Sequence, residues 1–375
     1  MLMCDVAVIG IGGVGSAAAA YLAQAGADVI GLDRYSPPHA RGSSHGQTRV
    51  IRMAYFEHPD YVPLLRRAYR GWHDLERATG RQLYFPTGVL QIGPESGEVI
   101  AGTLRSAQQH RLAIQQFRYE DIASEFPGVV PPADCVGILE HDAGYLLVAE
   151  CINAYLDQAK QHGATIKTDS PVQSWSRTGE AFELRTDSEV IHAKQLVLCG
   201  GAWAKQLLAD LNVPMTILRK HLYWYENDAP AYTPASSFPV FLIVTPQGIY
   251  YGFPQLDSQG VKLARHDGGE PIASADQQNQ REDAADRRAV ETFTSSHLPL
   301  LSHNLVHHEA CMYTVTPDQH FLVGTHPEHE GLHFAAGLSG HGFKFASALG
   351  EILCDLATTG RTSAPIEFLS PRRFS

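Results

Sequence analysis

The chain lacks the cysteine and charge patterns that mark several common classes of protein. No two of its cysteines are spaced as Cys-x-x-Cys, which argues against a zinc ribbon or a disulfide framework and favours a reducing compartment. The scattered cysteines are Cys4, Cys135, Cys151, Cys199, Cys311 and Cys354. Basic residues are outnumbered by acidic ones, and the formal net charge of −11 provides no broad positive field for nucleic acid or an anionic membrane.

Long hydrophobic runs are also scarce. Residues 6–27 carry no charge, but their glycines, Gln24 and the missing basic flank argue against a membrane span. A signal peptide is equally unexpected, because the same stretch belongs to the motif described next. We therefore expect a cytoplasmic protein that contacts neither membrane nor nucleic acid.

What the chain does have is a glycine-rich segment at residues 10–15, Gly-Ile-Gly-Gly-Val-Gly. It follows an apolar run at 6–9 that predicts a buried strand, and it opens an alanine-rich predicted helix at 16–25. Asp33 closes a second apolar run. This order is typical of a dinucleotide-binding unit, in which Gly10, Gly12 and Gly15 let the backbone approach a pyrophosphate at a helix N-terminus. Asp33 would accept hydrogen bonds from ribose hydroxyls. A tight turn without a ligand is the alternative, and it leaves Asp33 without a role.

The length of 375 residues favours two domains, and no internal repeat is visible. Hydrophobic periodicity predicts helices at 59–76, 97–110, 119–126, 148–162, 281–297 and 337–359. Short apolar runs predict strands at 82–93, 165–167, 195–199, 322–324 and 333–336, and an antiparallel sheet within 215–265. The expected fold class is α/β (α+β overall). A Rossmann-like nucleotide domain, discontinuous in sequence, comprises 1–80, 148–214 and 320–375. A mainly antiparallel substrate domain is inserted at 81–147 and 215–319. The C-terminal return to the first domain favours a cofactor touched at both ends, such as FAD.

Several longer motifs resemble those of the monomeric sarcosine oxidase and N-methyltryptophan oxidase family, FAD-dependent amine oxidoreductases of the D-amino acid oxidase superfamily. The matching segments are 37–39, 42–52, 54–55, 250–254, 262–266, 310–314, 318–321 and 337–345. With the glycine motif they extend over nearly the whole chain. Ser44 and Gln47 depart from the family pattern, in which a histidine and an aspartate are frequent.

The resemblance implies a set of cofactor-binding residues. Cys311 would carry FAD through an 8α-S-cysteinyl bond, whereas its residue type alone indicates a buried cysteine that acts as a small hydrophobe. The glycine turn at 340–342 would open the last helix and stabilise negative charge on the reduced flavin. The other implied contacts are Arg34, Ser43, His45, Thr48, Arg49, Val172, Gly340, Gly342 and Lys344.

Further residues are assigned by the resemblance to substrate and chemistry. Arg52 and Lys344 would bind a substrate carboxylate, and Tyr251 would line the same side. Lys262 would stand where oxygen is reduced, and the remaining catalytic assignments are Arg49, His266 and Tyr313. Without the resemblance, a solvated strand lysine at Lys262 and ordinary aromatic packing at each tyrosine remain open.

The resulting functional hypothesis is a flavin-dependent oxidase of a secondary amine in an N-methyl amino acid. Sarcosine is the first choice, giving glycine, formaldehyde and hydrogen peroxide from oxygen and water. N-methyltryptophan and pipecolate-like cyclic amino acids remain open, as do an NAD(P)-dependent dehydrogenase and a non-catalytic nucleotide-binding protein. The expected partners are a small amino acid and O2, and a monomer is expected.

Two groups of histidines have spacings that raise the question of a metal. No thiolate or HExxH pattern accompanies them, and Pro327 interrupts any helix. We interpret them as surface-loop residues and predict no metal. The two groups are His303, His307 and His308, and His326, His329 and His333.

Overall fold

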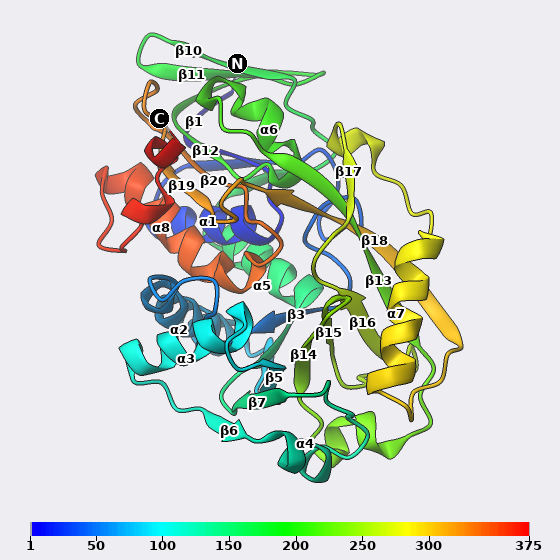
Figure 1. Cartoon of the computed structure of the whole chain (residues 1–375). Helices are drawn as coiled ribbons and strands as arrows, with labels where there is room; N and C mark the ends of the chain where they lie inside the picture. Colours follow the sequence, from blue (N-terminus) through cyan, green and yellow to red (C-terminus); the bar gives the residue numbers. More distant parts are fainter. Residues whose placement is uncertain (1, 375) are drawn as a thin grey trace.

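A computed structural model, which describes residues 2–374, is built around two large β-sheets (Figure 1). The first sheet has a parallel centre formed by strands from distant parts of the chain. These strands are β1 (Leu2–Ile9), β2 (Val29–Leu32), β9 (Thr165–Lys167), β12 (Val190–Leu198) and β20 (Leu332–Ala336). Antiparallel strands extend it: β10 (Ser174–Thr178), β11 (Ala181–Arg185) and β19 (Leu322–Thr325). The predicted α/β class with a Rossmann-like sheet is confirmed.

The second sheet is mainly antiparallel, and its strand order is β17-β13-β16-β15-β14-β5-β7-β6, with β18 on the other side of β13. Its strands are β5 (Val89–Pro94), β6 (Gln115–Phe117), β7 (Cys135–Glu140), β13 (Thr216–Tyr225), β14 (Val240–Thr245), β15 (Gly248–Gly252), β16 (Val261–Arg265), β17 (Glu270–Ile272) and β18 (Leu305–Val315). One pair, β5 with β14, is parallel. Helix α7 (Ala284–His297) packs on this sheet, where Phe293 stacks on Tyr250 with ring centroids 4.3 Å apart.

A small third sheet is formed by segments that connect strands of the first large sheet to strands of the second along the chain. It consists of β3 (Thr48–Ile51), β8 (Gly144–Leu147) and β4 (Tyr84–Phe85). Three further helices lie outside the helical core described below. They are α3 (Glu98–His110), α4 (Tyr119–Glu125) and α6 (Ala204–Leu207).

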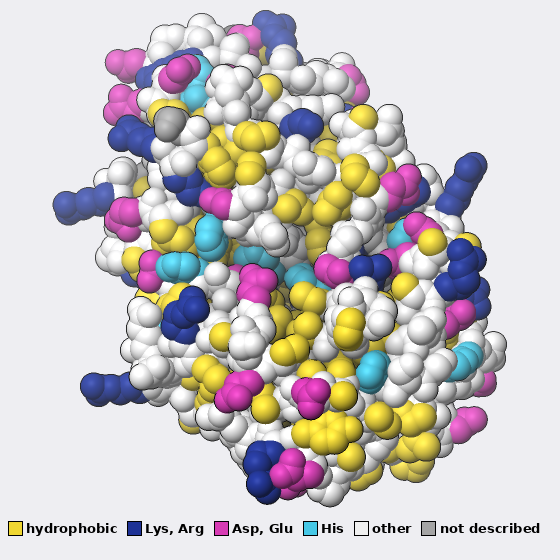
Figure 2. Space-filling model, in the orientation of Figure 1, with side chains coloured by type: hydrophobic (Ala, Val, Ile, Leu, Met, Phe, Trp, Pro, Cys, Tyr) yellow, Lys and Arg dark blue, Asp and Glu magenta, His cyan; other side chains and the backbone are white. Residues whose placement is uncertain are grey.

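The surface carries acidic and basic side chains side by side. On the face shown in Figure 2 they are interspersed among polar and apolar groups, without a broad patch of one sign. Among the described residues, no helix is both long and apolar enough to cross a bilayer.

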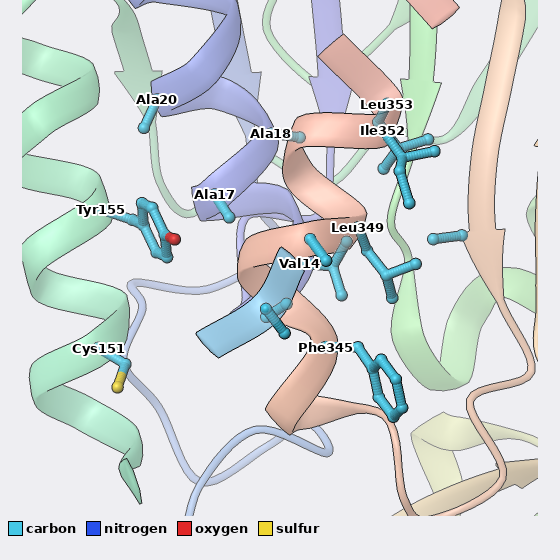
Figure 3. Close-up of a cluster of buried hydrophobic side chains, with 14 of the residues drawn as sticks. Val14, Ala17, Ala18, Ala20, Cys151, Tyr155, Phe345, Leu349, Ile352 and Leu353 are labelled. Carbon is cyan, nitrogen blue, oxygen red and sulfur yellow. The ribbon is translucent and has the colours of Figure 1, made fainter. Parts of the chain in front are cut away.

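Four helices contribute to the core beside the first sheet. They are α1 (Gly13–Gln24), α2 (Tyr61–Thr79), α5 (Val148–Gln161) and α8 (Ala346–Thr359). Figure 3 labels side chains from α1, α5 and the segment that includes α8. The alanines of α1 allow a close approach: a Cβ added at Gly350 of α8 would lie 2.6 Å from the Cβ of Ala17. Phe345 and Leu349 point into the same core (Figure 3). This packing fixes the glycine turn before α1 relative to the turn before α8.

Two predicted elements are wrong. The segment 82–93 is two strands rather than one, because Pro86 has no N–H to donate and Gly88 has φ +78°. The segment 337–359 is not one helix: residues 337–342 are irregular, a 3-10 turn covers Phe343–Phe345, and α8 follows. Positive φ angles at Gly337, Ser339 and Gly340 are incompatible with a right-handed helix. The predicted domain boundaries stay a prediction.

Candidate active site

A cavity of about 540 Å³ extends from the glycine turn after β1 to the second sheet. Most of the predicted site residues line it, although they come from every third of the chain. These lining residues are Gly10, Gly12, Asp33, Arg34, Ser43, Arg49, Arg52, Val172, Tyr251, His266, Tyr313, Gly340, Gly342 and Lys344. Five others lie behind the wall: Gly15, His45, Thr48, Lys262 and Cys311.

The glycine turn leaves no room for side chains at two of its positions. A Cβ at Gly15 would lie 1.7 Å from the carbonyl oxygen of Gly10, and a Cβ at Gly10 would lie 2.5 Å from that of Cys199. Gly10 also has φ +83°, which favours glycine. Gly12 and Gly13 face the cavity at the start of α1, where first-turn N–H groups lack helical partners. This cradle fits a pyrophosphate.

Asp33 lies at the end of β2 and is 9% exposed. Its Oδ2 accepts the Ile11 N–H at 2.9 Å, and its Oδ1 accepts the Tyr35 N–H at 3.0 Å. These bonds fix the carboxylate against the glycine turn and leave lone pairs for a ribose. The neighbouring Arg34 pairs instead with Asp276, which also accepts the indole N–H of Trp203 at 3.0 Å.

Lys262 of β16 is buried, and its ammonium group reaches the backbone of β3. Its Nζ donates to the carbonyl and hydroxyl oxygens of Thr48 at 2.9 and 3.2 Å, and to the carbonyl oxygen of Gly46. Burial lowers the pKa of Lys262 well below its usual value, and the nearby Arg49 lowers it further. Arg49 itself lines the cavity and donates to the carbonyl of Ser43 at 2.9 Å.

Cys311 is a buried thiol on β18, opposite Lys220 of β13. Burial raises the pKa of the thiol, although the charges of Arg49, Lys220 and Lys262 oppose this effect. The thiol is therefore next to cations without being on the cavity surface. His45 lies in the same region, where its Nδ1 is 2.9 Å from the carboxylate of Glu309.

The end of the cavity away from the glycine turn holds two buried cations, Arg52 and Lys344. Arg52 is engaged by Glu57, whose two oxygens lie 2.9 and 2.8 Å from Nη2. Burial raises the pKa of Glu57, but Arg52 together with His341 and Lys344 outweighs it and lowers the value to about 2. Burial and Arg52 lower the pKa of Lys344 to about 7.

Three aromatic side chains also line the cavity: Tyr251, His266 and Tyr313. The ring centroids of Tyr251 and His266 are 6.1 Å apart, and those of His266 and Tyr313 are 6.0 Å apart. Burial lowers the pKa of His266 to about 4 and raises that of Tyr251 to about 12, so both are neutral near pH 7.

Three side chains that support these residues are not among the predicted site residues. Glu57 follows Arg52 by five positions, and a local acid near a predicted carboxylate ligand was a usable signal. His341 also lines the cavity, whereas the glycine turn around it indicates a role for its backbone alone. Glu140 is buried and accepts the N–H groups of Met53 and Ala54 at 2.6 and 2.7 Å, and nothing local in the sequence indicates that contact.

The interpretation of six histidines as surface-loop residues is wrong for several of them. His326 and His333 are each only 3% exposed, and His307 and His308 lie on β18. Nε2 of His326 and of His329 both lie close to Oδ2 of Asp210, at 3.2 and 3.1 Å. The N–H of Glu328 donates to Nδ1 of His326, so the proton of neutral His326 is on Nε2, facing Asp210. His329 has hydrogen-bond geometry to this carboxylate, whereas Nε2 of His326 is buried beside it without a hydrogen-bond partner among the described residues.

The fold and the cavity are those expected of a dinucleotide-binding protein, with the strands of the first sheet drawn from distant parts of the chain. Residues 5–356 match the family model of FAD dependent oxidoreductases, and the chain belongs to this family. It is therefore an FAD-dependent enzyme, and the NAD(P)-dependent alternative is overturned.

The chain is 37% identical over 374 residues to a monomeric sarcosine oxidase of Bacillus sp. (strain NS-129), covering 98% of this chain and 96% of that one. It is 36% identical over 372 residues to the N-methyl-L-tryptophan oxidase of Yersinia pestis (strain Pestoides F), covering 99% of both. Among solved structures, it resembles NikD, described as an unusual amino acid oxidase essential for nikkomycin biosynthesis, with TM-score 0.87 and 25% identity over 99% of this chain and 98% of that one. An L-proline dehydrogenase from P. horikoshii shares the fold, with TM-score 0.85 and 21% identity over 100% and 98%. The predicted family resemblance is confirmed.

Proposed function

We propose that this protein is an oxidase of a secondary amine in an N-methyl amino acid, with sarcosine as the first candidate substrate. The observation that carries this proposal is the pair of buried cations, Arg52 and Lys344, at the end of the cavity away from the nucleotide-binding turn. FAD, when bound, supplies the two-electron oxidation of the carbon–nitrogen bond and the transfer of these electrons to O2. The balanced reaction converts sarcosine, O2 and H2O into glycine, formaldehyde and H2O2.

Substrate binding depends on the two cations. A guanidinium group binds a carboxylate through two parallel N–H bonds, and an ammonium group adds a point charge. Because Glu57 already occupies Nη2 of Arg52, a substrate carboxylate must either displace Glu57 or use the remaining N–H groups and Lys344. Both routes favour a small ligand whose carboxylate can reach Arg52 and Lys344.

The substrate amine would face Tyr251, His266 and Tyr313. A neutral His266 accepts or donates a hydrogen bond without adding charge, and burial of the pocket disfavours an ammonium ion. The pocket thereby favours the neutral amine, whose lone pair is required for oxidation. These residues orient the amine, and none of them is asked to form a covalent bond.

Oxygen reduction is assigned to the surroundings of Lys262. A cation fixed by acceptors on Gly46 and Thr48 stabilises negative charge that develops on oxygen, at no further reorganisation cost. The assignment rests on the family resemblance, and the rigid anchoring of the ammonium group supports it.

Covalent attachment of FAD through Cys311 is part of the proposal. The three nearby cations, Arg49, Lys220 and Lys262, favour the thiolate that such a bond requires. Acid-precipitated protein should keep its yellow colour, and Cys311→Ser should release the flavin on precipitation, with Cys354→Ser as the matched control. A colourless acid pellet from a yellow preparation of the unaltered protein would refute the tether.

Substrate size is set by the apolar wall of the same end, which includes Val89, Phe241 and Leu242. The test is a peroxide assay with sarcosine, N-methyltryptophan and pipecolate, in which sarcosine should give the highest kcat/KM. Peroxide from none of these amines, by a protein that holds FAD, would overturn the proposed function. We also propose that the enzyme works as a monomer, and sedimentation at assay concentration tests this.

A further inference from the structure

Tyr55 is a fully buried residue in the segment between β3 and α2, and it is absent from the cavity wall. It nevertheless contacts three groups that line that wall, namely Arg52, His341 and Lys344. Its own carbonyl accepts a hydrogen bond from the hydroxyl of Ser106 on α3, at 2.5 Å. The residue is therefore anchored from behind and faces the predicted carboxylate-binding end.

The direction of the hydrogen bonds at the Tyr55 hydroxyl follows from His341. Nε2 of His341 faces the carbonyl oxygen of Gln319 at 3.0 Å, so this nitrogen carries the proton. Nδ1 is then an acceptor and receives the Tyr55 O–H at 2.5 Å. The free lone pair of the phenol accepts from Lys344 Nζ at 3.5 Å, while Lys344 also donates to the carbonyl of His341 at 2.7 Å.

The Tyr55 ring contributes separately from its hydroxyl. The guanidinium carbon of Arg52 lies 4.4 Å from the ring centroid, and Nζ of Lys344 lies 5.2 Å from it. Both separations are within the range of cation–π attraction, which is stronger in a desolvated site. Arg52 also lies 4.4 Å from the ring of Phe56, and Lys344 lies 5.7 Å from that of Phe345, but the ring of Tyr55 is within reach of both cations.

Resting on the proposed function, we propose that Tyr55 is a positioning residue that holds Arg52 and Lys344 where they bind the substrate carboxylate and stabilises their positive charges. Its hydroxyl fixes the Lys344 ammonium against His341, and its ring attracts both cations. Tyr55 makes no contact with substrate, so its removal acts on carboxylate affinity and leaves amine recognition in place.

The experiment separates the ring from the hydroxyl with Tyr55→Leu and Tyr55→Phe. Tyr232→Leu and Tyr232→Phe are matched controls, because Tyr232 is equally buried and donates to the carbonyl of Gly128. The probes are acetate, a carboxylate without an amine, and dimethylamine, an amine without a carboxylate. Their dissociation constants are measured from the perturbation of the flavin absorbance of the holoenzyme.

Tyr55→Leu should weaken acetate binding about tenfold, the loss expected for cation–π contacts in a desolvated site. Dimethylamine should change by less than about twofold, and the Tyr232 variants should alter neither probe. Tyr55→Phe keeps the ring and should weaken acetate about threefold, as expected for one hydrogen bond. If the leucine variant holds no FAD, the phenylalanine variant carries the test.

The pH dependence of acetate binding provides a readout that a merely structural role would not move. Acetate binding should weaken as the pH rises through the titration of Lys344, and Tyr55→Leu should move that weakening to lower pH. The charged and titratable groups around Lys344 are Arg49, Arg52, Tyr55, Glu57, His266 and His341. Because burial keeps the pKa of both His266 and His341 far below 7, neither accounts for a change near neutral pH.

Equal weakening of acetate and dimethylamine would overturn the role of Tyr55, because general disruption of the pocket predicts that pattern. Unchanged acetate affinity in both Tyr55 variants would overturn it as well. A wild-type holoenzyme that binds neither acetate nor any N-methyl amino acid would instead refute the proposed function, and Tyr55 with it.

Discussion

In the glycine turn, replacing glycine by alanine should have different consequences at two positions, Gly15 and Gly12. Gly15→Ala places a methyl group 1.7 Å from the carbonyl oxygen of Gly10, where ordinary contacts begin at 3.4 Å. The obstacle is backbone, so rotation of a side chain cannot relieve the clash. The start of α1 would have to move away from β1 by roughly the missing 1.7 Å, which is more than a packed core absorbs.

Overpacked positions of this kind typically destabilise a protein by about 1–3 kcal/mol, and occasionally by more. Gly15→Ala should be at or above about 3 kcal/mol, because α1 is also packed against α5 and α8 and has no free direction in which to shift. Displacement of the helix start should in addition abolish FAD binding.

Gly12→Ala is the matched control. Its new Cβ would meet only the hydroxyl of Ser44, at 3.9 Å. The φ of Gly12, −71°, is negative, but its ψ of −147° lies outside the helical and extended regions that alanine prefers. The methyl group would also project where the cradle must approach a pyrophosphate. We therefore expect Gly12→Ala to lose about 1 kcal/mol of stability in urea, well below the loss in Gly15→Ala, together with markedly weakened FAD binding.

The assays are urea unfolding of the flavin-free proteins, followed by circular dichroism, and titration with FAD, followed by flavin fluorescence. Expression under riboflavin limitation provides the flavin-free forms. The reasoning is refuted if Gly15→Ala unfolds at the wild-type urea concentration, or if Gly12→Ala binds FAD as tightly as the unaltered protein.

Three further predictions concern oxygen, pH and packing. Lys262→Met should slow flavin reoxidation by O2 at least tenfold more than flavin reduction, measured by stopped flow; equal slowing would contradict the assignment. The lowered pKa of Glu57, about 2, corresponds to about 3 kcal/mol favouring the ionised folded state. Glu57→Gln should therefore be less stable than wild type above pH 4.5, and the difference should shrink as the pH falls towards 2, which urea unfolding at several pH values checks. Gly350→Ala should cost about 1–3 kcal/mol by the same method, because its Cβ meets Ala17.

The parts of the fold that the sequence predicted are those whose signal is local. The strand–turn–helix start and α5 depend on apolar periodicity and on glycine, both of which are visible within a short window. The parallel pairing of β5 with β14 joins residues about 150 positions apart, a separation outside any local window. The irregular segment 337–342 has apolar content that suits a helix, but its positive φ angles arise from tertiary contacts such as that of Gly340 with Tyr313.

In the site, too, residue types could be predicted from the sequence, whereas contacts between distant side chains could not. Most of the residues that the motif resemblance assigned to the site line one cavity. The resemblance gave no information on how the charged groups there are paired. The engagement of Arg52 by Glu57 and the burial of His326 depend on which side chains meet in space. Sequence patterns identify residue types that could bind a carboxylate, whereas geometry decides which of them is free to do so.

Basic side chains gather on the cavity wall, although the chain as a whole is negatively charged. Although the net charge of the chain is −11, Arg49, Arg52 and Lys344 all lie on the wall of the cavity, and Lys262 is buried behind it. Glu57 is the one acid among the described residues that line the end holding Arg52 and Lys344, and the acids Glu140 and Glu309 lie behind the wall, so acids balance these cations only in part. Burial makes this excess costly, as the lowered pKa of Lys344 shows. An entering carboxylate relieves the repulsion, and it should raise the pKa of Lys344 as it binds. The stored repulsion should therefore favour ligands that carry a carboxylate over neutral amines of the same size, despite the net negative charge of the chain.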